Sequence, residues 1–372
     1  MTNMTGKIAR AVLVGCCLGT AMPGAQTSPP ASLLVLSKGD LTLSIVDPAT
    51  LKVLGRVPSG PDPHEVVASA DGRTAYISNY HAPNNIITVV DLVAMKALAP
   101  IDLGMLIAPH GLTFVGGKLW FTAEGSKVIG GYDPVSSKVD WVLGTGQNRT
   151  HMIFVAADLQ RMVTSNVSSA TMTIIEKTAG GGRSGPGGSP PGGSNPGGAR
   201  SGPPPGAANR GGGPGGPGGG PQSDWDETVV PVGRGAEGFD VSPDGKEIWA
   251  ANAQDGTVSI VDFTARKVTQ TLDANVSGAN RLKFTPDGRL ALISTLRGPD
   301  LTILDAATRR EVKRLNIGHG AAGIQMQPDG LRAYVACTPD DSVTIIDLKS
   351  LEVAGHIAGG RQPDGLAWAV RR

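Results

Sequence analysis

Residues 63–79, PHEVVASADGRTAYISN, contain two runs of alternating apolar residues separated by an Asp-Gly pair. Alternation with a period of two predicts β-strands, because successive side chains of a strand point to opposite faces. An Asp-Gly pair between two such runs predicts a hairpin, because Gly readily adopts the positive φ of a tight turn. This stretch therefore predicts a pair of antiparallel strands.

The same hairpin recurs three more times along the chain, each time around a Pro-Asp-Gly turn. The copies are residues 237–252 (EGFDVSPDGKEIWAAN), 280–295 (NRLKFTPDGRLALIST) and 322–337 (AGIQMQPDGLRAYVAC). Each copy is followed by a polar turn and a β-branched run, for example DGTVSIVDFTARKVTQTLD in residues 255–273. A repeat of about forty residues with four short strands has the size of one β-propeller blade.

The residue just before the first apolar position of each repeat gives the number of blades. We call these residues the seven axial positions: His64, His110, His151, Glu237, Asn280, Ala322 and Asp364. They are 46, 41, 86, 43, 42 and 42 residues apart, and the one long interval contains a low-complexity segment. The sequence therefore predicts an all-β fold, a β-propeller of seven four-stranded blades.

The two ends of the chain are predicted to complete one blade together. One strand follows Asp364, whereas residues 32–60 contain three strands without a first strand before them. Pairing of the N-terminal strands with the C-terminal strand closes the ring and removes exposed strand edges that would otherwise pair with other chains. Residues 32–372 are therefore predicted to form one domain.

A Gly/Pro-rich segment, residues 179–221, interrupts the fourth blade, counted from the blade that the termini close. Such a composition buries too little apolar surface to offset the entropy of ordering, so it predicts disorder. The segment replaces the turn between the third and fourth strands, which in an up-and-down blade lies on the face opposite His64. We interpret it as a tolerated loop extension. Contact of its arginines with a cell wall or a partner is the alternative.

Residues 1–25 are typical of a cleaved secretory signal peptide. Lys7 and Arg10 precede a short apolar run, which small residues follow. The run is too short to span a bilayer. We expect a periplasmic or extracellular protein without a membrane span in the mature chain. Lipoprotein anchoring at Cys16, within LVGC, is the alternative.

Charge and cysteine content argue against several classes of function. The chain has 33 Lys and Arg and 32 Asp and Glu, a formal net charge of +1, which gives no electrostatic reason to bind nucleic acid. Three cysteines, two of them in the predicted signal peptide, exclude a disulfide framework. The sequence has no Cys-x-x-Cys-His motif for haem attachment. A closed ring with a near-neutral surface is expected to be a monomer.

The repeats resemble those of the YVTN-type seven-bladed β-propellers, also called YncE-like or surface-layer-type repeats. The resemblance is carried by SADGRTAYISN, SPDGKEIWAAN and QPDGLRAYVAC and by the strands ITVVD, VSIVD and VTIID, and it covers nearly the whole chain outside the Gly/Pro-rich segment. It implies the seven-bladed fold. It implies no single function, because similar repeats serve in secreted binding proteins, in surface layers and in propellers related to haem- or copper-enzyme domains.

Equivalent positions of successive blades point toward the central axis at one height, so the axial positions predict a polar, His-rich pocket. Four of them supply three imidazoles and a carboxylate, a donor set that suits a divalent zinc, manganese or iron ion. The predicted metal ligands are His64, His110, His151 and Glu237. The predicted ligand-binding channel, all of it expected on one face, comprises His64, Glu65, His81, His110, His151, Glu237, Asn280, Arg281 and Asp364.

Two classes of function remain open. The first is a secreted or periplasmic binding or scaffold propeller whose axial pocket holds a small molecule or whose face docks an extracytoplasmic protein. The second, by analogy with propellers that carry axial His-rich metal sites, is a metal-dependent lyase or lactone hydrolase acting on a carbohydrate-like acid. A metal-free variant of the second would use a histidine as general base and Arg281 as a clamp for an anionic substrate. The candidate catalytic residues are His64, His110, His151 and Arg281.

Overall fold

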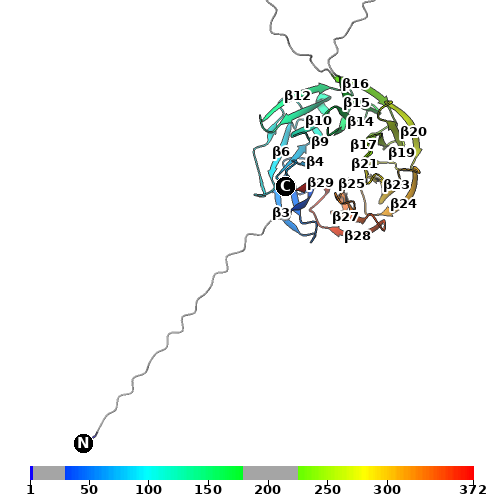
Figure 1. Cartoon of the computed structure of the whole chain (residues 1–372). Coiled ribbons are helices and arrows are strands. Elements are labelled where there is room, and N and C mark those ends of the chain that lie inside the picture. Colours follow the sequence, from blue (N-terminus) through cyan, green and yellow to red (C-terminus); the bar gives the residue numbers. More distant parts are fainter. Residues whose placement is uncertain (3–29, 179–224) are drawn as a thin grey trace, which may run out of the picture.

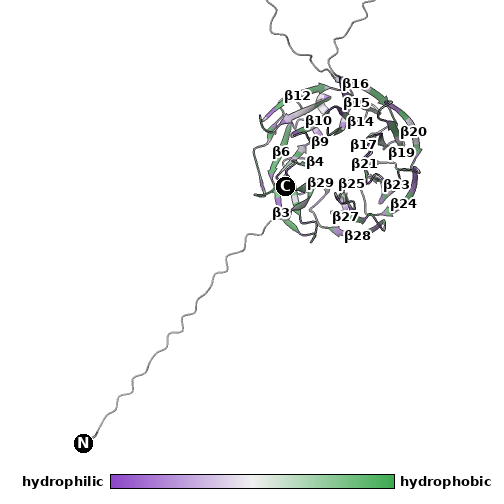
Figure 2. Cartoon of the chain, in the orientation of Figure 1, coloured by the Kyte–Doolittle hydropathy of each residue, from purple (hydrophilic) through white to green (hydrophobic). Residues whose placement is uncertain are grey.

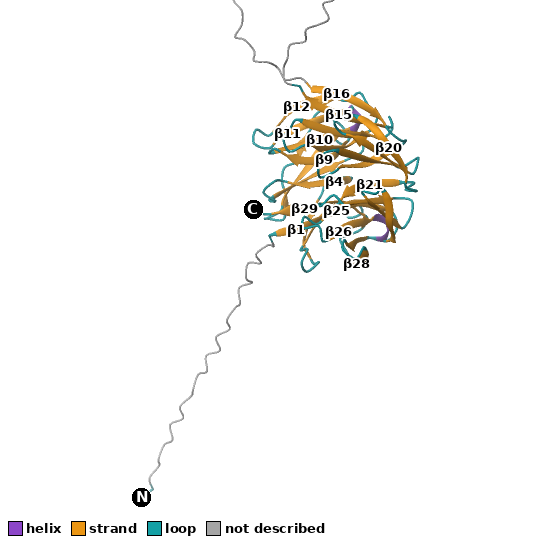
Figure 3. Cartoon of the chain, turned by 45° about the vertical axis from the view of Figure 1, so that its right-hand side comes forward, coloured by secondary structure: helices purple, strands orange, loops and turns teal. Residues whose placement is uncertain are grey.

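The computed structural model describes residues 1–2, 30–178 and 225–372, and these residues form seven antiparallel sheets around one axis (Figure 1). Strands make up almost all of the regular structure (Figure 3). The predicted all-β, seven-bladed propeller is therefore confirmed. The part of the chain that the structure describes has no helix long and apolar enough to cross a membrane.

Each blade runs outward from an innermost strand at the axis. The first comprises β29 (Pro363–Val370), β1 (Ala31–Ser37), β2 (Thr42–Val46) and β3 (Val53–Pro58). The second comprises β4 (Pro63–Ala68), β5 (Thr74–Asn79) and β6 (Ile86–Asp91), with its fourth position divided between β7 (Lys96–Ala97) and β8 (Ile101–Asp102). The third comprises β9 (Pro109–Val115), β10 (Lys118–Ala123), β11 (Val128–Asp133) and β12 (Lys138–Gly144).

The remaining four blades follow the same order. The fourth comprises β13 (Thr150–Val155), β14 (Arg161–Asn166), β15 (Thr171–Lys177) and β16 (Trp225–Pro231). The fifth comprises β17 (Ala236–Val241), β18 (Glu247–Asn252), β19 (Thr257–Asp262) and β20 (Lys267–Asp273). The sixth comprises β21 (Ala279–Phe284), β22 (Leu290–Thr295), β23 (Asp300–Asp305) and β24 (Arg310–Asn316). The seventh comprises β25 (Ala321–Met326), β26 (Arg332–Cys337), β27 (Ser342–Asp347) and β28 (Glu352–Ile357). Two short 3-10 turns, η1 (Glu124–Ser126) and η2 (Thr338–Asp340), follow second strands.

The ring closes as the sequence predicts, because β1 pairs with strands from both ends of the chain. Leu34 of β1 lies opposite Ala367 of β29 on one side and opposite Ile45 of β2 on the other. Six of the seven residues of β1 are buried, since neighbouring blades cover both of its faces. The C-terminal strand therefore supplies the innermost strand of a blade whose other three strands come from the N-terminal region.

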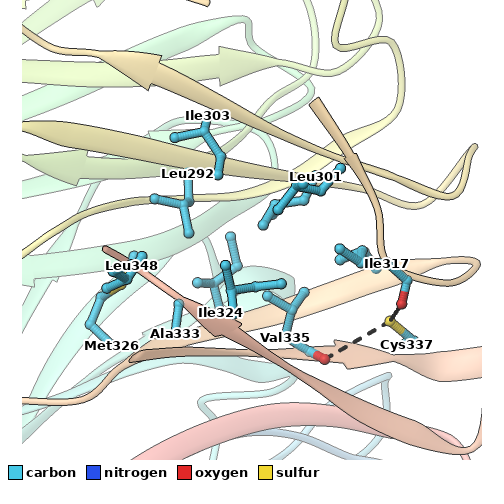
Figure 4. Packing of buried hydrophobic residues seen from close by; sticks show 13 residues of the cluster. Leu292, Leu301, Ile303, Ile317, Ile324, Met326, Ala333, Val335, Cys337 and Leu348 are labelled. Carbon is cyan, nitrogen blue, oxygen red and sulfur yellow. Dashed lines mark hydrogen bonds between the residues drawn. The ribbon is translucent and has the colours of Figure 1, made fainter. Parts of the chain in front are cut away.

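Apolar side chains fill the spaces between neighbouring blades. Figure 2 shows hydrophobic stretches on strands all around the ring. Between the sixth and seventh blades, Leu292 and Ile303 face Ile324 and Val335 (Figure 4). Cys337 belongs to the same cluster, where its thiol contacts the carbonyl oxygen of Ile317 at 3.3 Å. Burial raises the pKa of this thiol, which agrees with a packing role.

Two predicted segments fall on residues that the structure does not describe. Residues 3–25 of the predicted signal peptide and the predicted Gly/Pro-rich insert at 179–221 lie outside the described residues. The strands on either side of the insert, β15 and β16, pair from Thr171 opposite Pro231 to Lys177 opposite Trp225. The insert therefore connects the third and fourth strands of the fourth blade.

The Asp-Gly turns have one common geometry. The carboxylate of Asp71 accepts hydrogen bonds from the Ser69 hydroxyl at 2.6 Å and from the backbone N–H of Arg73 at 3.1 Å. Gly72 has φ +66°, and its equivalent in the fifth blade, Gly245, has φ +70°. The surroundings of the two glycines differ, because a Cβ at Gly72 would overlap the carbonyl oxygen of Val370 at the end of the closing strand, whereas nothing lies within 4 Å of one at Gly245.

Replacing each glycine by alanine should separate the energetic cost of turn strain from the cost of disturbing the closing strand. Gly245→Ala should lower the free energy of unfolding by about 1–2 kcal/mol, the usual cost of a left-handed φ for a residue with a Cβ. Gly72→Ala should cost more, because it also displaces the backbone of β29. Chemical denaturation of both variants measures the difference, and equal losses would contradict a contact between this turn and the closing strand.

Candidate functional site

One end of the central axis holds a cavity of about 620 Å³, which we call the histidine pocket. All seven axial positions line it, and each is the second residue of the innermost strand of its blade. Because these strands start at the same height, their second residues converge on one mouth of the axis. His81 lies at the rim of this pocket, with 68 % of its side chain exposed. The structure thus brings together His64, His81, His110, His151, Glu237, Asn280, Arg281 and Asp364.

Hydroxyl groups of the second strands hold the axial positions at this height. The Thr122 hydroxyl accepts the N–H of Gly111 at 2.8 Å and donates to the carbonyl oxygen of His151 in the next blade at 2.7 Å. The Ser165 hydroxyl donates in the same way to the carbonyl oxygen of Glu237 at 3.0 Å. Ser294 repeats the arrangement, accepting the N–H of Arg281 and donating to the carbonyl oxygen of Ala322. Each of these hydroxyls connects its own inner strand to the neighbouring one.

Glu65 does not line the histidine pocket, although it was expected on the same face. It lines a second cavity of about 340 Å³ on the axis, together with residues such as Phe114 and Trp368. The expectation was wrong because Glu65 is one residue further along β4 than His64, and residues 65–68 of this strand line the second cavity. Its carboxylate forms an ion pair with Arg281, which lines both cavities. Arg281 also donates to the carbonyl oxygen of Asn280 at 3.0 Å.

His151 is held between two carboxylates. It is 2 % exposed, its Nδ1 lies 2.5 Å from Glu124 Oε1, and its Nε2 lies 3.4 Å from Glu237 Oε1. Desolvation lowers the pKa of His151, but the hydrogen bonds and charges of the two carboxylates outweigh it, so the pKa is raised. Burial raises the pKa of Glu237, and His151 and Arg149 more than offset this and lower it to about 2. His151 is therefore best described as an imidazolium between two carboxylates.

Sequence reasoning missed three residues that complete this network. Tyr80 donates its hydroxyl to Glu124, and burial followed by this hydrogen bond raises the pKa of Tyr80. Arg149 Nη2 lies 3.3 Å from Glu237 Oε1, and its Nε lies 3.6 Å from Glu124 Oε1. Tyr80 and Glu124 each come directly after the second strand of their blade, as Lys38 does in the first blade. The repeat period that gave the axial positions would also have shown this second set of equivalent positions.

His64 is neutral and is bonded on both sides of its ring. Its Nε2 lies 2.7 Å from Lys38 Nζ, which must be the donor, so Nε2 carries no proton. The ring proton is then on Nδ1, 3.3 Å from the carbonyl oxygen of Asp62. Burial and then the charge of Lys38 lower the pKa of His64. Lys38 also forms an ion pair with Asp364 at 3.1 Å.

His110 differs from its neighbours in having no hydrogen-bond partner in the part of the chain that the structure describes. Its ring stacks on His151 with 3.7 Å between the ring centroids and lies 5.4 Å from the ring of His64. Its Nδ1 is buried and makes no hydrogen bond among the described residues, and the same holds for Oδ1 of Asn280. Burial and then the charge of His151 lower the pKa of His110 well below its ordinary value. A neutral imidazole thus stacks against a charged one.

The four residues predicted as metal ligands all line the pocket, and the prediction remains untested. As they lie, their donor atoms have other partners: both nitrogens of His151 face carboxylates, and Nε2 of His64 faces Lys38. Metal binding by His64, His110, His151 and Glu237 would require these contacts to break, so that the donor atoms could face the ion instead.

Comparison with known proteins shows similarity of fold. No protein-family profile and no curated protein matches the chain. Among solved structures it is similar to a functionally unknown protein from Desulfotomaculum acetoxidans DSM 771, at 10% sequence identity and a TM-score of 0.68, covering 92% of this chain and 99% of that one. A putative 6-phosphogluconolactonase from Bacteroides fragilis NCTC 9343 has 14% identity and a TM-score of 0.66 over the same shares. The hydrazine synthase of Kuenenia stuttgartiensis has 16% identity and a TM-score of 0.60, covering 82% of this chain and 89% of that one. At these identities the likeness concerns the propeller fold alone.

Substitution of His151 should give a pH-dependent loss of stability. A raised pKa in the folded state stabilises the fold fully below the unfolded value of about 6.5, and this contribution is lost as the pH rises through the folded pKa. At pH 6, His151→Gln should therefore lower the free energy of unfolding by about 3 kcal/mol. The loss should become smaller toward pH 9.

Urea unfolding of the wild type and His151→Gln between pH 6 and pH 9 measures this difference. Gly245→Ala is the matched control, because it destabilises the fold without changing a titratable group. A loss that stays constant with pH in His151→Gln, as expected for the control, would contradict the charged state of His151.

Proposed function

We propose that the protein is a secreted or periplasmic YVTN-type propeller that binds a small polyhydroxylated molecule in the histidine pocket. The observation that carries the proposal is His110, a neutral buried imidazole in the pocket lining without a hydrogen-bond partner among the described residues. Leaving a buried polar atom unpartnered costs about 1–3 kcal/mol. Native structures keep few such atoms, and those that persist often have a functional reason.

The charges around the pocket favour hydroxyl groups over a strongly anionic ligand. Each cation of the lining already faces a carboxylate: Lys38 faces Asp364, Arg149 faces Glu237, His151 faces Glu124 and Glu237, and Arg281 faces Glu65. Such a lining presents fixed donors beside fixed acceptors. Hydroxyls suit it because each can donate one hydrogen bond and accept others. A volume of about 620 Å³ is within the usual range for a small-molecule site.

The extracytoplasmic location and the YVTN-type relationship are parts of this proposal. The first rests on residues 1–25 and the second on the repeated hairpins. N-terminal sequencing of the protein recovered outside the cytoplasm tests the location, with a mature chain that starts near residue 26 as the expected result. Recovery of an uncleaved chain in the cytoplasm would contradict it.

Replacing His110 by leucine, a residue of similar volume, should separate binding from stability. His110→Leu should unfold at the same or a higher temperature than the wild type, because it removes an unpartnered buried polar atom. Neutral sugars and sugar acids should be screened for a ligand that raises the melting temperature of the wild type. That ligand should have no effect on His110→Leu.

Two results of this screen would contradict the proposal. One is a wild-type chain whose melting temperature no polyhydroxylated compound changes. The other is a ligand that stabilises His110→Leu as well as it stabilises the wild type. Leu331→Ala is a suitable control for nonspecific effects, because Leu331 is exposed on a turn away from the pocket and its change should not alter ligand binding.

A metal-dependent lyase or lactone hydrolase is the second candidate function. The neutral rings of His64 and His110 favour it, because a general base must be unprotonated when it accepts a proton. The neighbour described as a putative 6-phosphogluconolactonase supports it at the level of the fold. Turnover of a sugar lactone that is lost both in His110→Leu and after treatment with a chelator would favour this enzyme over a binding protein.

A further inference from the structure

A separate group of donor atoms lies at the rim of the histidine pocket, within the second blade. We propose that Asp62, His64 and His81 form a binding site for one divalent transition-metal ion, such as Zn²⁺ or Co²⁺. Among the described residues, they are the one group of at least three His, Cys, Asp or Glu side chains whose ligand atoms all lie within 4.8 Å of one another. This set differs from the four residues predicted from the sequence and shares only His64 with them.

The carboxylate of Asp62 faces both imidazoles at once. Its Oδ1 lies 3.5 Å from Nδ1 of His64, and its Oδ2 contacts Nδ1 of His81. Donor atoms bound to zinc at about 2.0–2.2 Å in a tetrahedral site lie about 3.3–3.6 Å apart. The separation between Asp62 and His64 already has this value. His81 is largely exposed, so its ring can move to complete the set.

The backbone of the second blade holds the three ligands near one another. Asp62 precedes β4 directly, and His81 lies in the turn between β5 and β6. The N–H of Tyr80 donates to the carbonyl oxygen of Asp62 at 3.0 Å and ties the two segments together. Both Asp62 and His81 have a left-handed φ, +47° and +44° respectively. The site is thus built within one blade and needs no movement of the ring of blades.

Ion pairing alone contributes too little free energy to explain why Asp62, His64 and His81 lie together. An exposed ion pair such as that between His81 and Asp62 contributes about 0–1 kcal/mol. The seventh blade has a comparable pair, in which Nδ1 of His319 lies 3.2 Å from Oδ1 of Asp340, but no third ligand among the described residues accompanies it. Two imidazoles and one carboxylate are the donors that zinc and related ions take in sites with an open coordination position.

Metal binding would also change the contacts of Lys38. Without metal, the ring proton of His64 is on Nδ1. A metal ion bound to Nδ1 takes the place of this proton, so the neutral ring then carries its proton on Nε2. Nε2 then becomes a donor and can no longer accept from Lys38, which now lies 2.7 Å away. Asp364, at 3.1 Å, can retain the ammonium group. Occupancy of the site would therefore rearrange the polar lining of the histidine pocket without requiring a bound organic ligand.

Metal titration of the chelator-treated protein tests the proposal. Calorimetry with Zn²⁺ and the visible absorption of Co²⁺ should show one equivalent bound per chain. Asp62→Asn and His81→Ala should each weaken the affinity at least tenfold. Lys38→Met should bind as tightly as the wild type or more tightly, because no competing donor remains on His64.

Two control variants locate the ion. His319→Ala, which removes the histidine of the comparable pair, and His151→Gln, which removes a ligand of the four-residue set, should bind Zn²⁺ like the wild type. Retention of wild-type affinity in His81→Ala would overturn the proposal, as would the absence of saturable binding. Loss of binding in His151→Gln but not in His81→Ala would place the ion in the four-residue set instead. Because His81 is exposed, its variant should keep the wild-type melting temperature, and because His110 is not a ligand, His110→Leu should still bind the ion.

Discussion

The hydroxyl group that joins the inner strands of neighbouring blades is the constraint on which the site depends. Thr122, Ser165 and Ser294 each take an N–H from their own blade and give their proton to the carbonyl oxygen of the next axial residue. The backbone is packed closely at this level. A Cβ at Gly111 would lie 2.5 Å from the carbonyl oxygen of His151, so a side chain at this position would separate the blades. These contacts hold the main chains of neighbouring blades at one level, and the side chains of the axial residues line one pocket.

Much of the fold and part of the site could be predicted from the sequence, and the reason is the repeat. Burial between blades and turn chemistry are local properties, so each copy of the hairpin showed them, and the period placed His110 and His151 beside His64. Glu124 belongs to a different set of equivalent positions, directly after the second strand, so the axial positions do not predict it. The ion pair of Glu65 with Arg281 could not be predicted, because it joins residues 216 apart in sequence from blades that are three apart around the ring. Such a contact depends on the width of the axis and on side-chain direction, which a repeat pattern does not specify.

The charged side chains of the histidine pocket are paired with other side chains of the protein. Glu124 and Glu237 stabilise a charged ring at His151, while the stacked ring of His110 stays neutral. The two rings differ because one has carboxylate partners and the other has none among the described residues. A molecule entering the pocket thus meets donors and acceptors whose directions are already fixed, and affinity then depends on matching them rather than on net charge.

The ion pair between Glu65 and Arg281 also lies where the two axial cavities meet. It crosses the centre of the ring between blades that are as far apart as seven blades allow, and Arg281 borders the cavity on either side. The two cavities therefore share Arg281 in their linings. A change at Arg281 would therefore alter both cavities at once, including the one that Phe114 and Trp368 line.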